Sequence, residues 1–237
     1  MSSRHGSDLH PQAFRLSRRA RDRLSALATE LLAAGFDVTA AEAARGLCLL
    51  ALDLALGFAG ADTAAAFRLA ASDPTEVGIG KALDAFLNLL EVDSAERRSL
   101  RDARSLEQTH TSGRARRALH TQALRLPQVV RDQFNALALE LSADGADVTV
   151  GEATRGLFLL ALDLAFGFAG TEATYAFRLA ARDPTVEGAS RALTEVRFLL
   201  DPVPSTTPDP AASEEGAITT RGVDSSPPST FRTDRAA

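Results

Sequence analysis

The chain contains one sequence unit twice. Sliding the sequence against itself by 110 residues aligns residues 9–90 with residues 119–200 without a gap, and 48 of the 82 aligned pairs are identical. Residues 49–55 recur unchanged as residues 159–165. Two copies are too few for a solenoid, which needs at least three repeats. The duplication therefore predicts two similar units arranged as a pseudo-two-fold pair.

The duplication divides the chain into five segments. We expect a disordered N-terminus (1–8), a first repeat (9–90), a charged linker (91–118), a second repeat (119–200) and a disordered tail (201–237). The tail is rich in Pro, Ser, Thr and Asp, and it has too little apolar content to order itself.

Composition excludes several classes of protein. Hydrophobic residues make up 45% of the chain and charged residues 24%, which is typical of a globular protein with a buried core. A single cysteine, Cys48, excludes a disulfide scaffold. The sequence has no Cys/His cluster with metal-ligand spacing, so we predict no metal or cofactor site. We find no apolar segment typical of a secretory signal, and the most apolar run, residues 47–61, is too short to cross a membrane. These features predict a soluble cytoplasmic protein without a membrane partner.

Each copy is predicted to form a short strand followed by four helices. Alternation over residues 12–16 places Phe14 and Leu16 on one face of the strand and polar or small residues on the other. An apolar stripe at helical spacing follows, and a glycine, Gly35 in the first copy and Gly145 in the second, suits the C′ position of that helix. The third and fourth helices of the first copy are expected at residues 62–71 and 80–90.

The second helix of each copy has the clearest start. A threonine followed three residues later by a glutamate fits a capping box, in which each side chain satisfies a free backbone donor. The helix is then apolar at almost every position, so we expect it to be buried nearly all round. One glycine within it would let a neighbouring backbone come close. These residues are Thr39, Glu42 and Gly46 in the first copy and Thr149, Glu152 and Gly156 in the second.

A strand, an amphipathic helix, a glycine turn and a capped apolar helix within about 45 residues resemble the ribbon-helix-helix family of DNA-binding proteins. The resemblance covers residues 12–56 and 122–166. It implies a mainly α fold in which the two strands pair as an antiparallel ribbon, the ribbon enters the DNA major groove, and the N-terminus of each second helix holds a phosphate. The third and fourth helices of each copy lie outside the family pattern.

The charge distribution is consistent with that orientation. The net charge is −5, yet residues 1–35 carry six Arg against three acidic residues, and residues 110–135 carry five Arg against one. Residues 36–90 sum to −4 and residues 145–200 to −2. The chain therefore combines a basic strand layer with an acidic helix layer, as expected of a protein that binds DNA on one side. A solvated charged face on an ordinary helical bundle is the alternative.

The resemblance implies which residues would contact DNA. Arginine is the commonest reader of guanine, and alanine can touch a thymine methyl group. The candidates for base contact are Arg15, Arg125, Ala13, Ala123 and Thr121; those for phosphate contact are Arg18, Arg19, Arg21, Arg131, Thr39 and Thr149.

Two carboxylates interrupt the apolar second helices. Because a buried carboxylate must be paired or neutralised, Asp53 and Asp163 require partners. Arg68 and Arg178, on the next helix of each copy, are the predicted partners in two structural ion pairs.

The sequence therefore predicts a DNA-binding protein of modest specificity: a transcriptional repressor, a partition adaptor or a chromosome-organising factor of the bacterial nucleoid. The alternative is a non-catalytic protein–protein interaction scaffold that keeps the fold without binding DNA. We do not expect an enzyme, because no catalytic constellation is recognisable. The strands are expected to pair within one chain, since loop closure costs about 3 kcal/mol against 4–15 kcal/mol estimated for association. A stiffly helical linker would instead favour a swapped dimer, and a homo-oligomer through the outer helices is also open.

Overall fold

The computed structural model describes residues 9–92, 94–109, 119–168 and 170–201. Within these residues the protein is mainly helical, with one two-stranded antiparallel sheet. The N-terminal segment and the tail for which disorder is predicted lie outside the described residues, apart from Asp201.

The sheet joins the two copies. Strand β1 (Leu9–Ser17) pairs antiparallel with β2 (Leu119–Pro127), and the register is centred on Ala13 opposite Ala123. Both strands of this pair belong to the one chain that the structure contains. Both strands extend beyond the predicted core of five residues, because cross-strand hydrogen bonds satisfy the backbone whether or not the side chains alternate.

Four helices follow each strand, as predicted, and one further helix forms in the linker. The fourth helix of the first copy begins four residues earlier than predicted, because Thr75 caps it by accepting a hydrogen bond from the Gly78 N–H at 3.1 Å. The helices are α1 (Arg18–Ala33), α2 (Ala40–Ala55), α3 (Ala61–Ser72), α4 (Glu76–Leu89), α5 (Ser94–Thr109), α6 (Gln128–Ala143), α7 (Val150–Ala165), α8 (Gly170–Arg182) and α9 (Val186–Leu200).

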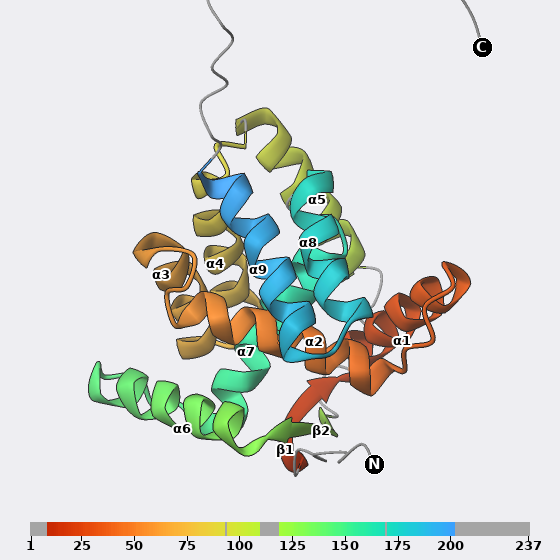
Figure 1. Ribbon diagram of the computed structural model, residues 1–237. Helices are drawn as coiled ribbons and strands as arrows, with labels where there is room; N and C mark the ends of the chain where they lie inside the picture. The colour runs from red at the N-terminus through yellow and green to blue at the C-terminus, as the bar shows by residue number, and fades with distance from the viewer. Residues whose placement is uncertain (1–8, 93, 110–118, 169, 202–237) are drawn as a thin grey trace, which may run out of the picture. The chain divides into compact units, whose positions relative to one another are not determined.

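The helices form layers behind the sheet (Figure 1). The sheet lies at one end, α1 and α6 extend to opposite sides of it, and α2 and α7 lie behind them. The turn after α1 contains Gly35 at φ +90° and the turn after α6 contains Gly145 at φ +93°, which confirms both predicted C′ glycines. The third and fourth helices of each copy form the layer farthest from the sheet, together with α5.

The third helix of each copy packs on the second helix of the other copy. Helix α3 packs on α7 of the second copy, and α8 packs on α2 of the first. A Cβ atom added to Gly46 would lie 1.9 Å from the Ala180 carbonyl oxygen, and one added to Gly156 would lie 2.0 Å from that of Ala70. The predicted close approach at both glycines is therefore confirmed. In each case the neighbouring backbone belongs to the other copy.

The two copies share one core. Phe67 and Phe177, which occupy equivalent positions in the copies, stack with ring centroids 6.3 Å apart and an interplanar angle of 2°. Phe86 contacts the Phe67 ring edge-on at 5.6 Å. Because equivalent rings meet at the centre, neither copy can bury its own apolar surface without the other.

Candidate nucleic-acid interface

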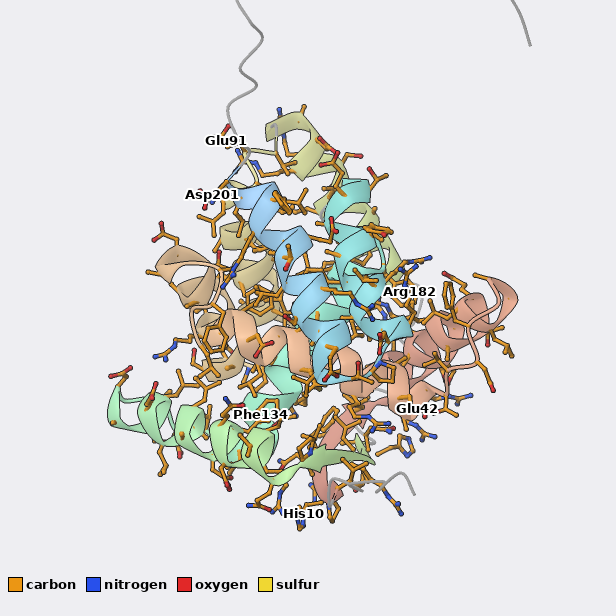
Figure 2. The ribbon with its side chains drawn as sticks, viewed as in Figure 1. His10, Glu42, Glu91, Phe134, Arg182 and Asp201 are labelled. Atoms are coloured by element: carbon orange, nitrogen blue, oxygen red, sulfur yellow. The ribbon has the colours of Figure 1, made fainter. Side chains whose placement is uncertain are left out.

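Alternation gives the two-stranded sheet one buried face and one exposed face. Phe14, Leu16, Leu124 and Leu126 are at most 3% exposed. The predicted alternation is therefore confirmed, and Gln12 faces the core. In Figure 2, His10 marks the sheet at the end of the molecule opposite Glu91 and Asp201. The exposed face consists of Leu9, Pro11, Ala13, Arg15, Leu119, Thr121, Ala123 and Arg125, which includes all five candidates for base contact.

Two arginines dominate the exposed face. Arg15 lies opposite Thr121, and Arg125 lies opposite Pro11, so the two guanidinium groups are on different strands and on opposite sides of the centre. Neither guanidinium forms an ion pair or hydrogen bond with another described residue. The four-residue offset corresponds to about 14 Å along the strands. Only small side chains, Ala13 and Ala123, lie between them.

The threonines at the starts of α2 and α7 are part of closed capping boxes. The Glu42 N–H donates to Thr39 Oγ1 at 3.2 Å, and Glu42 Oε2 accepts from the Thr39 N–H at 2.9 Å. The same bonds join Thr149 and Glu152. In the first box, the hydrogen bonds from the Thr39 hydroxyl and backbone N–H lower the pKa of Glu42. A phosphate here would therefore meet the free N–H groups of the first helical turn and a nearby carboxylate.

The arginines at the start of the first helices have different environments. Arg18 and Arg21 are exposed, and Arg18 forms a surface ion pair with Asp22 at 3.8 Å. Arg19 is half-buried and lines a cavity beside the sheet. Arg131, in the second copy, is also half-buried, and its Nη1 donates a long 3.4 Å hydrogen bond to a neighbouring glutamine. The exposed positive charge is thus concentrated on the first copy.

The predicted ion pairs of Asp53 with Arg68 and of Asp163 with Arg178 are wrong. Each arginine instead donates from Nε to a carbonyl in the last turn of the preceding helix, where carbonyl groups lack intrahelical partners. From Nη2 it reaches a glutamate on the first helix of the other copy, which the exchanged third helices bring close. These pairs are Arg68–Glu140 and Arg178–Glu30, both at 2.7 Å.

Asp163 has two other partners, and Asp53 has none among the described residues. Arg23 Nη1 lies 2.5 Å from Asp163 Oδ1, and Arg104 Nε lies 2.8 Å from Oδ2. The position equivalent to Arg23 is Gln133, and α5 lies in the linker, outside the repeated segment. Asp53 is half-buried without a cation, and burial raises its pKa to about 6.

Sequence reasoning missed the Arg23–Asp163–Arg104 network. Arg104 lies in the linker, which has no repeat equivalent to compare. The replacement of Arg23 by Gln133 was the one available signal, because it changes the charge at an otherwise matched helix position.

Comparison with protein-family models, curated proteins and solved structures found no match. In the described part of the chain, no helix is long and apolar enough to cross a membrane. No group of three or more His, Cys, Asp or Glu side chains is arranged to hold a metal ion within that same part.

Proposed function

We propose that this protein binds double-stranded DNA by inserting the β1–β2 ribbon into the major groove. The observation that carries the proposal is the pair Arg15 and Arg125, two guanidinium groups without partners among the described residues on the exposed face of a two-stranded sheet. The major groove of B-DNA is about 12 Å wide and admits a two-stranded β-ribbon. The resemblance to the ribbon-helix-helix family supports the same mode of binding.

The spacing of the two arginines fits two base contacts in one groove. Each guanidinium can donate two hydrogen bonds to guanine O6 and N7. Their separation of about 14 Å corresponds to roughly four base pairs at 3.4 Å per step. Ala13 and Ala123 leave room for the ribbon backbone to approach the bases, but they supply no hydrogen bonds. We therefore expect preference at two positions only, with modest sequence specificity.

Most of the affinity is expected from phosphate contacts, which fix the register but carry little sequence information. Arg18 and Arg21 are exposed at the start of α1, directly after β1, where a duplex backbone would pass. The N–H groups at the starts of α2 and α7 are further phosphate donors. A protein that binds DNA in this way would act as a transcriptional repressor, a partition adaptor or a chromosome-organising factor.

Fluorescence anisotropy with a random 20-base-pair duplex tests the proposal. We expect binding at 50 mM KCl that weakens steeply with salt, and a loss of sequence preference in a variant with Arg15→Ala and Arg125→Ala. Lys81→Ala, which removes an exposed positive charge from α4, is the control and should bind like the wild type. Absence of binding at low salt would favour the scaffold interpretation.

A further inference from the structure

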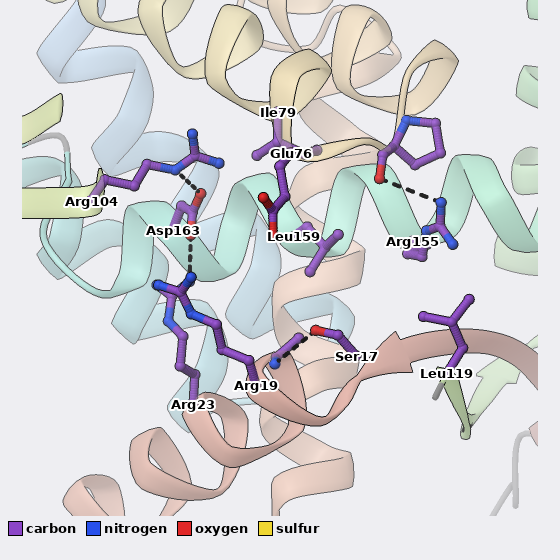
Figure 3. A pocket seen from close by; sticks show the side chains of 12 residues that line it. Ser17, Arg19, Arg23, Glu76, Ile79, Arg104, Leu119, Arg155, Leu159 and Asp163 are labelled. Atoms are coloured by element: carbon purple, nitrogen blue, oxygen red, sulfur yellow. Dashed lines mark hydrogen bonds and ion pairs between the residues drawn. The ribbon is translucent and has the colours of Figure 1, made fainter. Parts of the chain in front are cut away.

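A cavity of about 210 Å³ lies beside one end of the sheet, between α1, α4, α5 and α7 (Figure 3). Ser17 and Leu119, which pair at that end of the sheet, form part of its wall. The cavity is smaller than the roughly 300–1,000 Å³ of pockets that hold drug-sized ligands. It therefore suits a small molecule.

The wall of the cavity is rich in positive charge. Four guanidinium groups, those of Arg19, Arg23, Arg104 and Arg155, line it together with only two carboxylates. One of these carboxylates, Asp163, is 4% exposed and lies between Arg23 and Arg104 at the base of the cavity. A cavity wall with four guanidinium groups favours a negatively charged occupant, because hydrogen bonds from guanidinium groups to anions are strong.

Arg155 supplies a donor that no described residue satisfies. Its Nη2 donates a long 3.4 Å hydrogen bond to the Pro74 carbonyl oxygen, and its buried Nε has no hydrogen-bond partner. Most buried polar groups in proteins are hydrogen-bonded, so this Nε is a donor available to an acceptor in the cavity. The Nε of Arg45, the repeat equivalent of Arg155, is also buried without a partner among the described residues, so the available donor is common to both copies.

The remaining wall is apolar and includes Ile79 of α4 and Leu159 of α7. An occupant that satisfies both parts of the wall would combine a negatively charged head with a small apolar body. The second carboxylate, Glu76, is exposed and would oppose an anion rather than attract it.

The second copy does not reproduce this chemistry. At its equivalent positions, Val129 replaces Arg19, Gln133 replaces Arg23 and Val186 replaces Glu76. Helix α5, which carries Arg104, belongs to the linker and lies outside the repeated segment. Arg155 and Asp163 have charged equivalents, Arg45 and Asp53. Arg19, Arg23 and Glu76 are therefore particular to one side of the duplicated scaffold.

We propose that the cavity binds a small organic anion with an apolar body, of about the size of phenylacetate. The anion would accept hydrogen bonds from the arginines and pack its body against Ile79 and Leu159. The cavity also adjoins α1 and the end of the sheet, and Arg19 is a candidate for DNA phosphate contact. If the proposed DNA binding holds, on which this second step rests, the anion modulates DNA affinity.

Isothermal titration calorimetry of the full chain with phenylacetate and phenyl phosphate tests the site, and the two probes distinguish a carboxylate head from a phosphate head. We expect millimolar or tighter binding of at least one anion and none of neutral phenylacetamide. Arg155→Ala should weaken binding at least tenfold, and the matched variant Arg45→Ala should leave it unchanged. Glu76→Gln, at an exposed position, should tighten it severalfold, which keeps the test valid if the Arg155 variant fails to fold.

Binding of neither anion at 10 mM, or equal weakening by the Arg155 and Arg45 variants, would overturn the site. Repeating the DNA titration with saturating anion tests the second step, for which we expect a change in DNA Kd of at least threefold. Anion binding without any DNA binding would leave the site intact and reject the proposed function. DNA binding that the bound anion does not change would reject the modulation alone.

Discussion

Arg23 lies 2.5 Å from Asp163 across the boundary between the two copies, whereas their equivalents, Gln133 and Asp53, form no such pair. The scaffold is duplicated, but this contact is not. The Arg23 guanidinium also lies over the Phe166 ring, 4.6 Å from its centroid. The contact thus ties α1 of the first copy to the end of α7 in the second by charge and by a cation–π interaction.

This difference predicts unequal losses of stability from two equivalent substitutions. Asp163→Ala leaves two largely buried guanidinium groups without their shared carboxylate, so we expect a loss of about 3–5 kcal/mol in the free energy of unfolding. Asp53→Ala removes a half-buried carboxylate with no cation and should cost far less. Urea denaturation of both variants measures the difference. Equal losses would show that the ion pairs of Asp163 contribute no more to the free energy of unfolding than the environment of Asp53 does.

The pH dependence of stability is a separate test at Asp53. Its pKa is about 6 in the folded chain against an ordinary value of 3.8, so the folded state binds the proton more tightly than the unfolded state. The contribution of the protonated Asp53 carboxyl to the stability of the folded state is fully present below about pH 4 and is lost as the pH rises through 6. Asp53→Asn should therefore be more stable than the wild type by about 1 kcal/mol at pH 7.5, after allowance for partial exposure, and show no such advantage at pH 4. An advantage that is constant with pH would refute the assignment.

The close approach at Gly46 predicts a severe packing defect. A methyl group there would lie 1.9 Å from the Ala180 carbonyl oxygen, so Gly46→Ala must push α2 and α8 apart. We expect a loss of about 3 kcal/mol or more, at or above the upper end of overpacking effects. Gly151→Ala is the control, because its added Cβ would lie 3.2 Å from the nearest atom and the first copy already has Ala41 there. Thermal unfolding should separate the two variants clearly.

Local chemistry explains which features were predictable from the sequence. The capping box of Thr39 and Glu42 and the C′ position of Gly35 depend on residues within one turn of each other. The strand pairing followed because the duplication supplies two strands and the alternation defines which face is buried. The sequence also indicated that a backbone would approach Gly46, although it could not identify α8 as the neighbour.

The ion pairs and the cavity depend on contacts between the copies, which no local pattern encodes. The prediction paired Asp53 with Arg68 because the two lie on successive helices. The exchange of α3 and α8 instead carries Arg68 to Glu140 of the other copy. Arg104 could not be assigned, because the docking of α5 on one side of the core follows from the linker alone. Charge differences between the copies, such as Arg23 against Gln133, were the only local sign of asymmetry.

The same asymmetry predicts unequal phosphate contacts by the two copies, if the protein binds DNA as proposed. Arg21 is exposed at the start of α1, whereas its equivalent, Arg131, is half-buried and hydrogen-bonded to Gln128. Each phosphate contact adds about one unit to the slope of log K against log salt concentration. Arg21→Ala should therefore reduce that slope by about one, and Arg131→Ala by clearly less. Anisotropy titrations from 50 to 300 mM KCl measure both slopes, and equal reductions would mean that the duplex contacts the two copies alike despite their different charge.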